Sequence, residues 1–188
     1  ATGQALSRTA PREAKAVLAA VPENSPFLPE ARLTLARLAP EAERPARLNE
    51  VADAYPGTRV AEEALYSLAT FFQKDALYTE AAPYYRRLVD EFSSGEYAEN
   101  AAMRAAFEAL RGGRARDAAA PLETMARRAK SPAGFLYWAG VARQRAGETD
   151  RAAVLLAEAA DRYRNTWYGS LAGSGLEKLG PVQAVTPR

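Results

Sequence analysis

The fold can be predicted from residues 62–88, which read EEALYSLATFFQKDALYTEAAPYYRRL. Apolar residues in this stretch are three or four positions apart, first at Leu65, Leu68 and Phe72 and again at Ala81, Tyr85 and Leu88. Two such segments form a helix-turn-helix unit, and similar units start at Glu99 and Ala133, 37 and then 34 residues further on. This period is typical of stacked helical hairpins. The chain of 188 residues is therefore predicted to be all-α, an α-α superhelix of antiparallel hairpins with about ten helices.

The second and third units keep small residues where helices approach each other and lose the large ones. The unit from Glu99 has Ala105-Ala106 and then Gly113, and the unit from Ala133 has Ala139-Gly140 and then Gly147. Gly113 and Gly147 lie between the two helices of a hairpin, where glycine ends a helix without a Cβ clash. We expect these hairpins to pack along alanine-rich seams and to depend on their neighbours for stability.

A further match falls on the junctions between hairpins. Tyr55-Pro56-Gly57-Thr58 precedes one predicted hairpin, and Tyr163-Arg164-Asn165-Thr166 precedes the last predicted helix. The aromatic residue in each phrase is expected to end one hairpin and pack against the next. Core packing is the preferred interpretation of these aromatics, and a ligand-binding role is the alternative.

The composition excludes several kinds of catalytic site. The chain has no cysteine and no histidine, so it lacks thiolate nucleophiles, the usual zinc ligands and Ser-His-Asp relays. We predict no catalytic residue, no metal site and no cofactor within it. Its net charge is +2, divided into −3 for residues 1–98 and +5 for residues 99–188. The basic residues are mostly arginines scattered at helix-surface spacing, so a nucleic-acid partner is not expected, and no stretch is long enough for a membrane span.

The hairpin from Glu62 resembles the tetratricopeptide repeat. It has Leu65, then Leu68-Ala69 and Phe72 in its first helix, and Ala81 and Tyr85 in its second. The family pattern places a large residue, Leu-Gly and Tyr in the first helix and Ala-x3-Phe in the second. The other two units match only the small positions of this pattern.

The resemblance implies a binding face made by the first helix of each hairpin. The candidate residues on this concave face are Tyr66, Gln73, Lys74, Asn100, Phe107, Arg111, Tyr137, Gln144 and Arg145. Their aromatic, amide and basic side chains suit an extended peptide or an anionic glycan-peptide strand, with Arg111 and Arg145 placed to meet carboxylates. The alternative is a face that packs against a neighbouring domain or stays solvated.

A second resemblance is carried by residues 166–181, Thr-Trp-Tyr-Gly-Ser-Leu-Ala followed later by Glu-Lys-Leu-Gly-Pro. It resembles the segment, Tyr-Tyr-Gly-x-Leu-Ala and then Arg-Leu-Gly, that ends the superhelical domain of bacterial soluble lytic transglycosylases. Trp167 replaces the first Tyr and Lys178 the Arg. The resemblance implies a periplasmic, non-catalytic part of a peptidoglycan-cleaving enzyme. The Glu-Ser motif of the catalytic domain is absent from these residues, so that domain is expected after Arg188.

Two functions remain open at this stage. In the first, the chain is the scaffold of a lytic transglycosylase, and its partners are its own catalytic domain and peptidoglycan strands. In the second, it is a stand-alone adaptor that binds proteins of the cell envelope. In either case residues 1–54 are expected to form degenerate N-terminal helices, residues 55–180 three hairpins and a closing helix, and residues 181–188 a linker or tail.

Overall fold

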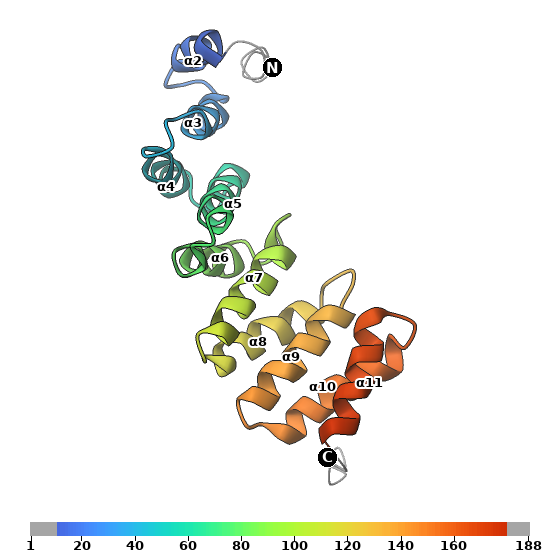
Figure 1. Cartoon of the computed structure of the whole chain (residues 1–188). Helices are drawn as coiled ribbons and strands as arrows, with labels where there is room; N and C mark the ends of the chain where they lie inside the picture. Colours follow the sequence, from blue (N-terminus) through green and yellow to red (C-terminus); the bar gives the residue numbers. More distant parts are fainter. Residues whose placement is uncertain (1–10, 180–188) are drawn as a thin grey trace. The chain divides into compact units, whose positions relative to one another are not determined.

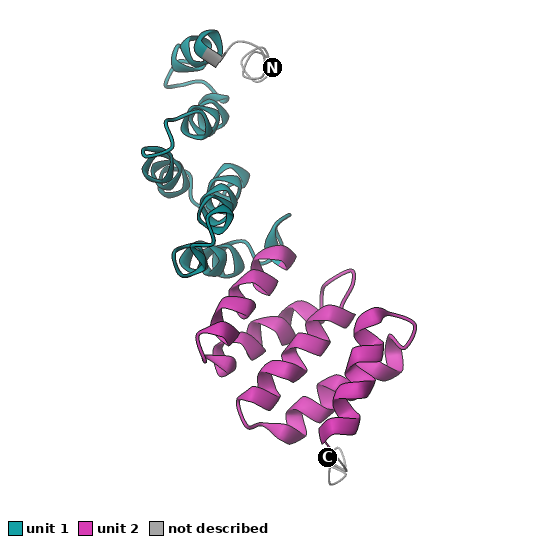
Figure 2. Cartoon of the chain, viewed as in Figure 1, with its two compact units in different colours: residues 1–98 teal, residues 99–188 magenta. Residues whose placement is uncertain are grey.

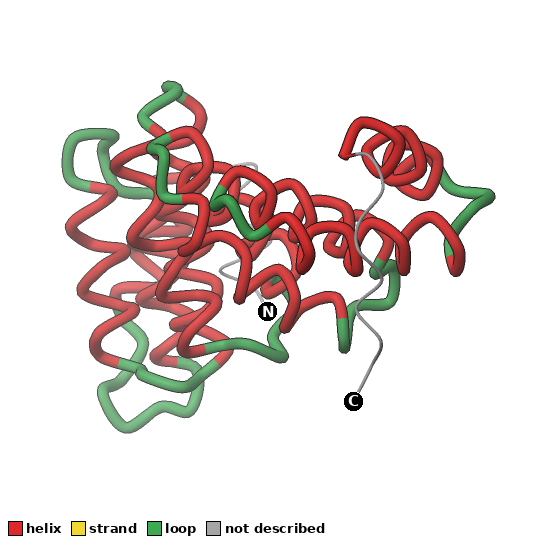
Figure 3. The backbone as a smooth tube through the Cα atoms, turned by 90° about the horizontal axis from the view of Figure 1, so that it is seen from below, coloured by secondary structure: helices red, strands yellow, loops and turns green. Residues whose placement is uncertain are grey.

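The computed structural model describes residues 11–179, and these residues form ten α-helices and no strand (Figures 1 and 3). The first five helices are α2 (Pro11–Ala19), α3 (Leu28–Arg37), α4 (Arg44–Ala54), α5 (Arg59–Lys74) and α6 (Tyr78–Glu91). The next five are α7 (Ala98–Arg111), α8 (Ala115–Ala126), α9 (Ala133–Arg145), α10 (Thr149–Arg162) and α11 (Trp167–Leu179). The predicted all-α fold of about ten helices is confirmed.

The chain divides into two compact units, which we call unit 1 (residues 1–98) and unit 2 (residues 99–188) (Figure 2). A boundary after residue 54 was predicted from the repeat pattern, which becomes regular there. That boundary separates degenerate from regular repeats, whereas the two units are defined by the packing of their own helices. The predicted tail, residues 181–188, lies outside the described residues.

The core of unit 1 combines small alanines with leucines, valines and one tyrosine. Helix α4 packs between α3 and α5, and α5 also packs against α6. The side chains of Leu48, Leu65, Leu68, Tyr85 and Leu88 are almost completely buried there. Helices α3 and α4 each carry a proline in the first two positions, where the missing backbone N–H has no intrahelical partner to lose. Pro83 lies inside α6, and the helix nevertheless continues to Glu91.

Unit 2 packs through alanine and glycine, as the sequence predicted. Helix α9 contacts α8, α10 and α11, and Ala139, Ala142, Ala152 and Ala159 are fully buried. A Cβ atom added to Gly140 would lie 2.7 Å from Cγ of Leu156 on α10. One added to Gly134 would lie 3.0 Å from the ring of Tyr168 on α11. The small residues of α9 therefore let the two neighbouring helices approach closely.

The turns inside the three hairpins share one backbone feature. Ala76, Gly113 and Gly147 occupy the corresponding position and have φ angles of 58°, 72° and 80°. The glycines predicted to end helices at residues 113 and 147 are confirmed in that role, because this left-handed region carries little steric cost for glycine. At residue 76 an alanine adopts the same conformation, which is unfavourable for a residue with a Cβ atom.

The junction phrases that match in sequence also match in structure. The hydroxyl of Thr58 donates to the carbonyl of Tyr55 (2.6 Å) and accepts from the N–H of Ala61 (3.3 Å). The hydroxyl of Thr166 donates to the carbonyl of Tyr163 (2.7 Å) and accepts from the N–H of Gly169 (3.1 Å). Each threonine thus caps the helix that follows its junction. Among the described helices, none is long and apolar enough to cross a bilayer.

Candidate binding surface

The candidate residues of unit 1 take part in contacts within that unit. The ring of Tyr66 stacks on the ring of Tyr97, with centroids 4.1 Å apart and planes 11° from parallel. The side chain of Gln73 accepts a hydrogen bond from the hydroxyl of the buried Tyr85, which joins α5 to α6. Lys74 is exposed and lies 3.8 Å from a carboxylate oxygen of Glu41. Tyr66 and Gln73 therefore contribute to packing, and Lys74 lies at the surface.

In unit 2 the candidate aromatics belong to a chain of ring contacts across α7, α9 and α11. Phe107 packs edge-on against Trp138 (4.8 Å between centroids), and Tyr137 contacts Tyr168 (5.7 Å). Tyr137 and Trp138 are neighbours on α9 and also touch, as do Tyr168 and Trp167. Phe107 and Tyr137 were predicted from the sequence as candidate residues, whereas Trp138 was not. These ring contacts hold the first helices of successive hairpins together.

The polar and basic candidates of unit 2 are exposed. The side chains of Asn100, Gln144 and Arg145 form no hydrogen bond or ion pair with another residue of the described range 11–179. Arg111 lies 3.7 Å from a carboxylate oxygen of Glu108, one turn earlier on α7. Asn100, Gln144 and Arg145 are presented to solvent by helices whose other faces are buried, so these three side chains are available to a partner.

A charged network that the sequence analysis did not predict joins α8, α9 and α10. The carboxylate of Glu123, 7% exposed, accepts from Arg143 (2.7 Å) and from Arg151 (2.6 Å). Arg143 also pairs with Glu148 (2.6 Å), which lies 3.5 Å from Arg116. Burial by itself would raise the pKa of Glu123, but the hydrogen bonds and charges of Arg151 and Arg143 outweigh burial and lower this pKa. The network is a structural connection between hairpins.

Two further glutamates make similar contacts in consecutive repeats. Glu62, near the start of α5, accepts a hydrogen bond from the backbone N–H of Tyr97, just before α7 (3.1 Å). Glu99, 37 residues later in the first turn of α7, accepts from the backbone N–H of Lys130, three residues before α9 (3.2 Å). Each glutamate therefore holds the loop that leads into the next hairpin. The repeated spacing of Glu62 and Glu99 was visible in the sequence, but the partner atoms were not.

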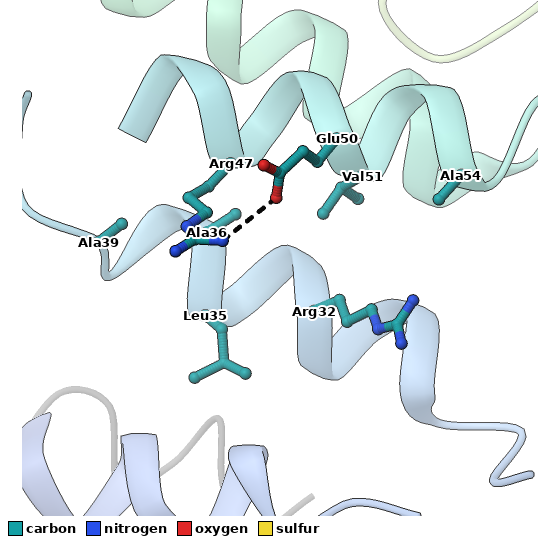
Figure 4. Close-up of a pocket in the computed structure, with 8 residues that line it drawn as sticks. All are labelled: Arg32, Leu35, Ala36, Ala39, Arg47, Glu50, Val51 and Ala54. Carbon is teal, nitrogen blue, oxygen red and sulfur yellow. Dashed lines mark hydrogen bonds and ion pairs between the residues drawn. The ribbon is translucent and has the colours of Figure 1, made fainter. Parts of the chain in front are cut away.

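Unit 1 also contains a groove of about 410 Å³ between α3 and α4 (Figure 4). Small apolar residues from both helices form much of its lining, and Arg32, Arg47 and Glu50 are the charged residues beside them. Arg32 pairs with Glu23 (2.8 Å) and Arg47 with Glu50 (3.4 Å). Because both guanidinium groups already have carboxylate partners, the groove does not present an unsatisfied charge to a ligand.

Comparison with known proteins agrees with this architecture. The tetratricopeptide repeat family model matches residues 135–166, which cover most of α9, the turn after it and all of α10. No curated protein matches the chain. One similar solved structure contains nearly identical TPR-like repeats of a Podosopora anserina protein assigned as a kinesin light chain. It is 15% identical, covers 88% of this chain and 93% of that chain, and superposes with a TM-score of 0.53.

A second structure, of a single-substitution variant of the same repeats, is 14% identical over 88% of this chain and 94% of that chain, with a TM-score of 0.52. At this level of identity the likeness concerns the fold. The fold is tetratricopeptide-like.

Proposed function

We propose that this chain is a non-catalytic scaffold that binds a polypeptide partner through the first helices of the hairpins in unit 2. The observation that carries the proposal is the exposure of Asn100, Gln144 and Arg145 on α7 and α9, which use their other faces for packing. Exposed amide and basic side chains on consecutive helices of a repeat array form an extended surface. A side-chain amide can donate a hydrogen bond to a backbone C=O group and accept one from a backbone N–H group of a bound peptide.

Site-specific photocross-linking in the source cell tests this proposal. A photoreactive phenylalanine analogue in place of Gln144 on α9 is expected to cross-link the chain to one discrete polypeptide. The matched control carries the same analogue in place of Ala157, which is exposed on α10, the second helix of the same hairpin. Absence of a cross-linked polypeptide from position 144, or the same products from both positions, would contradict the proposal.

We also propose, as a second candidate, that the scaffold belongs to a periplasmic peptidoglycan lytic transglycosylase. The supporting observation is the closing segment, in which Trp167-Tyr168-Gly169 begins α11 and Lys178-Leu179 ends it. Under this proposal the encoded protein continues beyond Arg188 into a lysozyme-like domain with a Glu-Ser motif. The full-length product is expected to release anhydro-sugars from sacculi, whereas these 188 residues alone leave sacculi intact. An unrelated domain at that position would rule this candidate out.

A further inference from the structure

Three cations repeat along the proposed binding surface. Arg111, Arg145 and Lys178 lie in the last turns of α7, α9 and α11, and all three are exposed. We call these three residues the basic row. Figure 1 shows α7, α9 and α11 running in one direction, with α8 and α10 running in the opposite direction, so the three last turns lie at the same end of unit 2. The row therefore places one cation on each successive first helix.

The usual spacing of packed helices restricts the conformation of a partner that spans the row. Packed helices have axes about 8 to 10 Å apart. A polyproline II segment rises about 3.1 Å per residue with three residues per turn, so every third side chain lies on one face, about 9 Å from the previous one. In a β-strand, by contrast, side chains of one face are about 6.6 Å apart, which does not match the helix spacing.

The residues beside the row favour the same conformation over a partner helix. Polyproline II backbone has no internal hydrogen bonds, so its N–H and C=O groups need partners, and the amide of Gln144 lies next to Arg145. One turn before Arg111 and Arg145, the half-buried Phe107 and Val141 offer apolar contact, and Phe107 also packs against Trp138. Aromatic surfaces of this kind accept proline-containing segments.

We propose that the basic row binds a polyproline II segment that carries an acidic residue at every third position. This inference rests on the proposed function and names the chemistry of its partner. Unit 2 has an excess of basic over acidic residues (14 and 9), which favours an anionic segment. Arg145 and Lys178 form no ion pair with another described residue, whereas Arg111 pairs with Glu108. Carboxylates whose spacing matches the distance between successive first helices could pair with all three cations at once.

Fluorescence anisotropy with three labelled peptides and the whole chain tests the inference. The first peptide repeats Glu-Pro-Ala four times, the second has the same composition with its glutamates clustered, and the third is an alanine-rich helix with glutamate at every seventh position. We expect the first peptide to bind about tenfold more tightly than the other two, since three exposed ion pairs contribute modestly and together. The preference should weaken as salt increases.

Charge reversals identify the surface involved. Arg145→Glu and Lys178→Glu are expected to remove the preference for the first peptide. Arg164→Glu is the matched control, because Arg164 is exposed and lies in the turn before α11, at the other end of that helix. Equal binding of the first two peptides, stronger binding of the helical peptide, or equal losses from Arg164→Glu and Arg145→Glu would each overturn the inference.

The two proposals fail separately in these experiments. If no peptide shows a preference but position 144 still cross-links to a polypeptide, the acidic period-three partner is wrong and the scaffold function stands. If cross-links are absent as well, both are wrong, and the three cations serve only to complement the partial negative charge at helix C-termini.

Discussion

At the scale of single residues, close backbone approaches explain where glycine is required. The first turn of α11 lies directly against the preceding loop, and a Cβ atom on Gly169 would overlap the carbonyl group of Tyr163. The added Cβ atom would be fixed to the backbone of Gly169, and it would meet the backbone of Tyr163. Relieving the overlap would therefore require a shift of α11 or of the loop that contains its capping residue, Thr166. By contrast, a Cβ atom on Gly173, one turn later in the same helix, would have no neighbour within 4 Å.

Gly169→Ala and Gly173→Ala form a matched pair of substitutions in α11. Gly169→Ala is expected to destabilise unit 2 by about 2 to 3 kcal/mol, because overpacking forces the backbone to shift. Gly173→Ala is expected to stabilise it by about 0.5 to 1 kcal/mol through helix propensity. Urea unfolding followed by circular dichroism measures both. Equal effects of the two substitutions would show that the close contact with Tyr163 has no energetic role.

A substitution at Ala76 is expected to increase stability. Its φ of 58° is shared by Gly113 and Gly147 in the other hairpins, and its side chain is exposed. Ala76→Gly is expected to stabilise the α5–α6 hairpin by up to about 1 kcal/mol, because relief of left-handed strain exceeds the added chain entropy. The control is Gly113→Ala, which should destabilise its own hairpin by a similar amount. Thermal unfolding that ranks the two variants in the reverse order would contradict this account.

At the scale of helices, the hairpins are joined both by ion pairs and by close packing at small residues. Glu123 on α8 reaches Arg143 on α9 and Arg151 on α10, so one buried carboxylate links three helices. Arg143 is about four-fifths buried, whereas about half of the Arg151 side chain is exposed. The pair with Arg143 is therefore less screened by solvent and is the stronger of the two.

Replacing this carboxylate gives a pH-dependent prediction. Glu123 has a lowered pKa in the folded chain, so its stabilising contribution is present above the ordinary glutamate pKa and is lost as the pH falls towards the lowered value. Glu123→Gln should cost about 1 to 3 kcal/mol at neutral pH and less in acid, because Arg143 loses its charged partner. Urea unfolding at pH 7 and at pH 3 measures the difference, and a cost that does not change with pH would refute this assignment.

At the scale of the chain, the hairpins are organised into two units with cores of similar composition. Alanines and leucines make up most of the buried apolar residues in both units, together with Tyr85 in unit 1 and with Met125 and Phe135 in unit 2. Unit 2 also contains the ring contacts of Phe107, Trp138, Tyr137 and Tyr168 and the Glu123 network. These contacts explain how a hairpin with few large residues at its repeat positions is held in place.

Much of this architecture could be predicted from the period of small and apolar residues. The spacing of Leu65, Leu68 and Phe72 predicts a helix face, and Gly113 and Gly147 predict the turns that follow. The candidate surface was predicted less completely. Asn100, Gln144 and Arg145 are exposed, whereas Gln73 is hydrogen-bonded to Tyr85 and Tyr66 stacks on Tyr97. A helical period predicts which residues share a face but not which side chains of other helices contact them.

The sequence by itself therefore determined the helices, their pairing into hairpins and the positions of their turns, since these depend on local spacing and backbone geometry. Only the tertiary structure decided which charged and aromatic side chains join the hairpins. Glu123 meets Arg143 and Arg151 across 20 and 28 residues of chain. Contacts at such separations depend on how whole helices pack, and the same packing leaves Arg145 and Lys178 exposed.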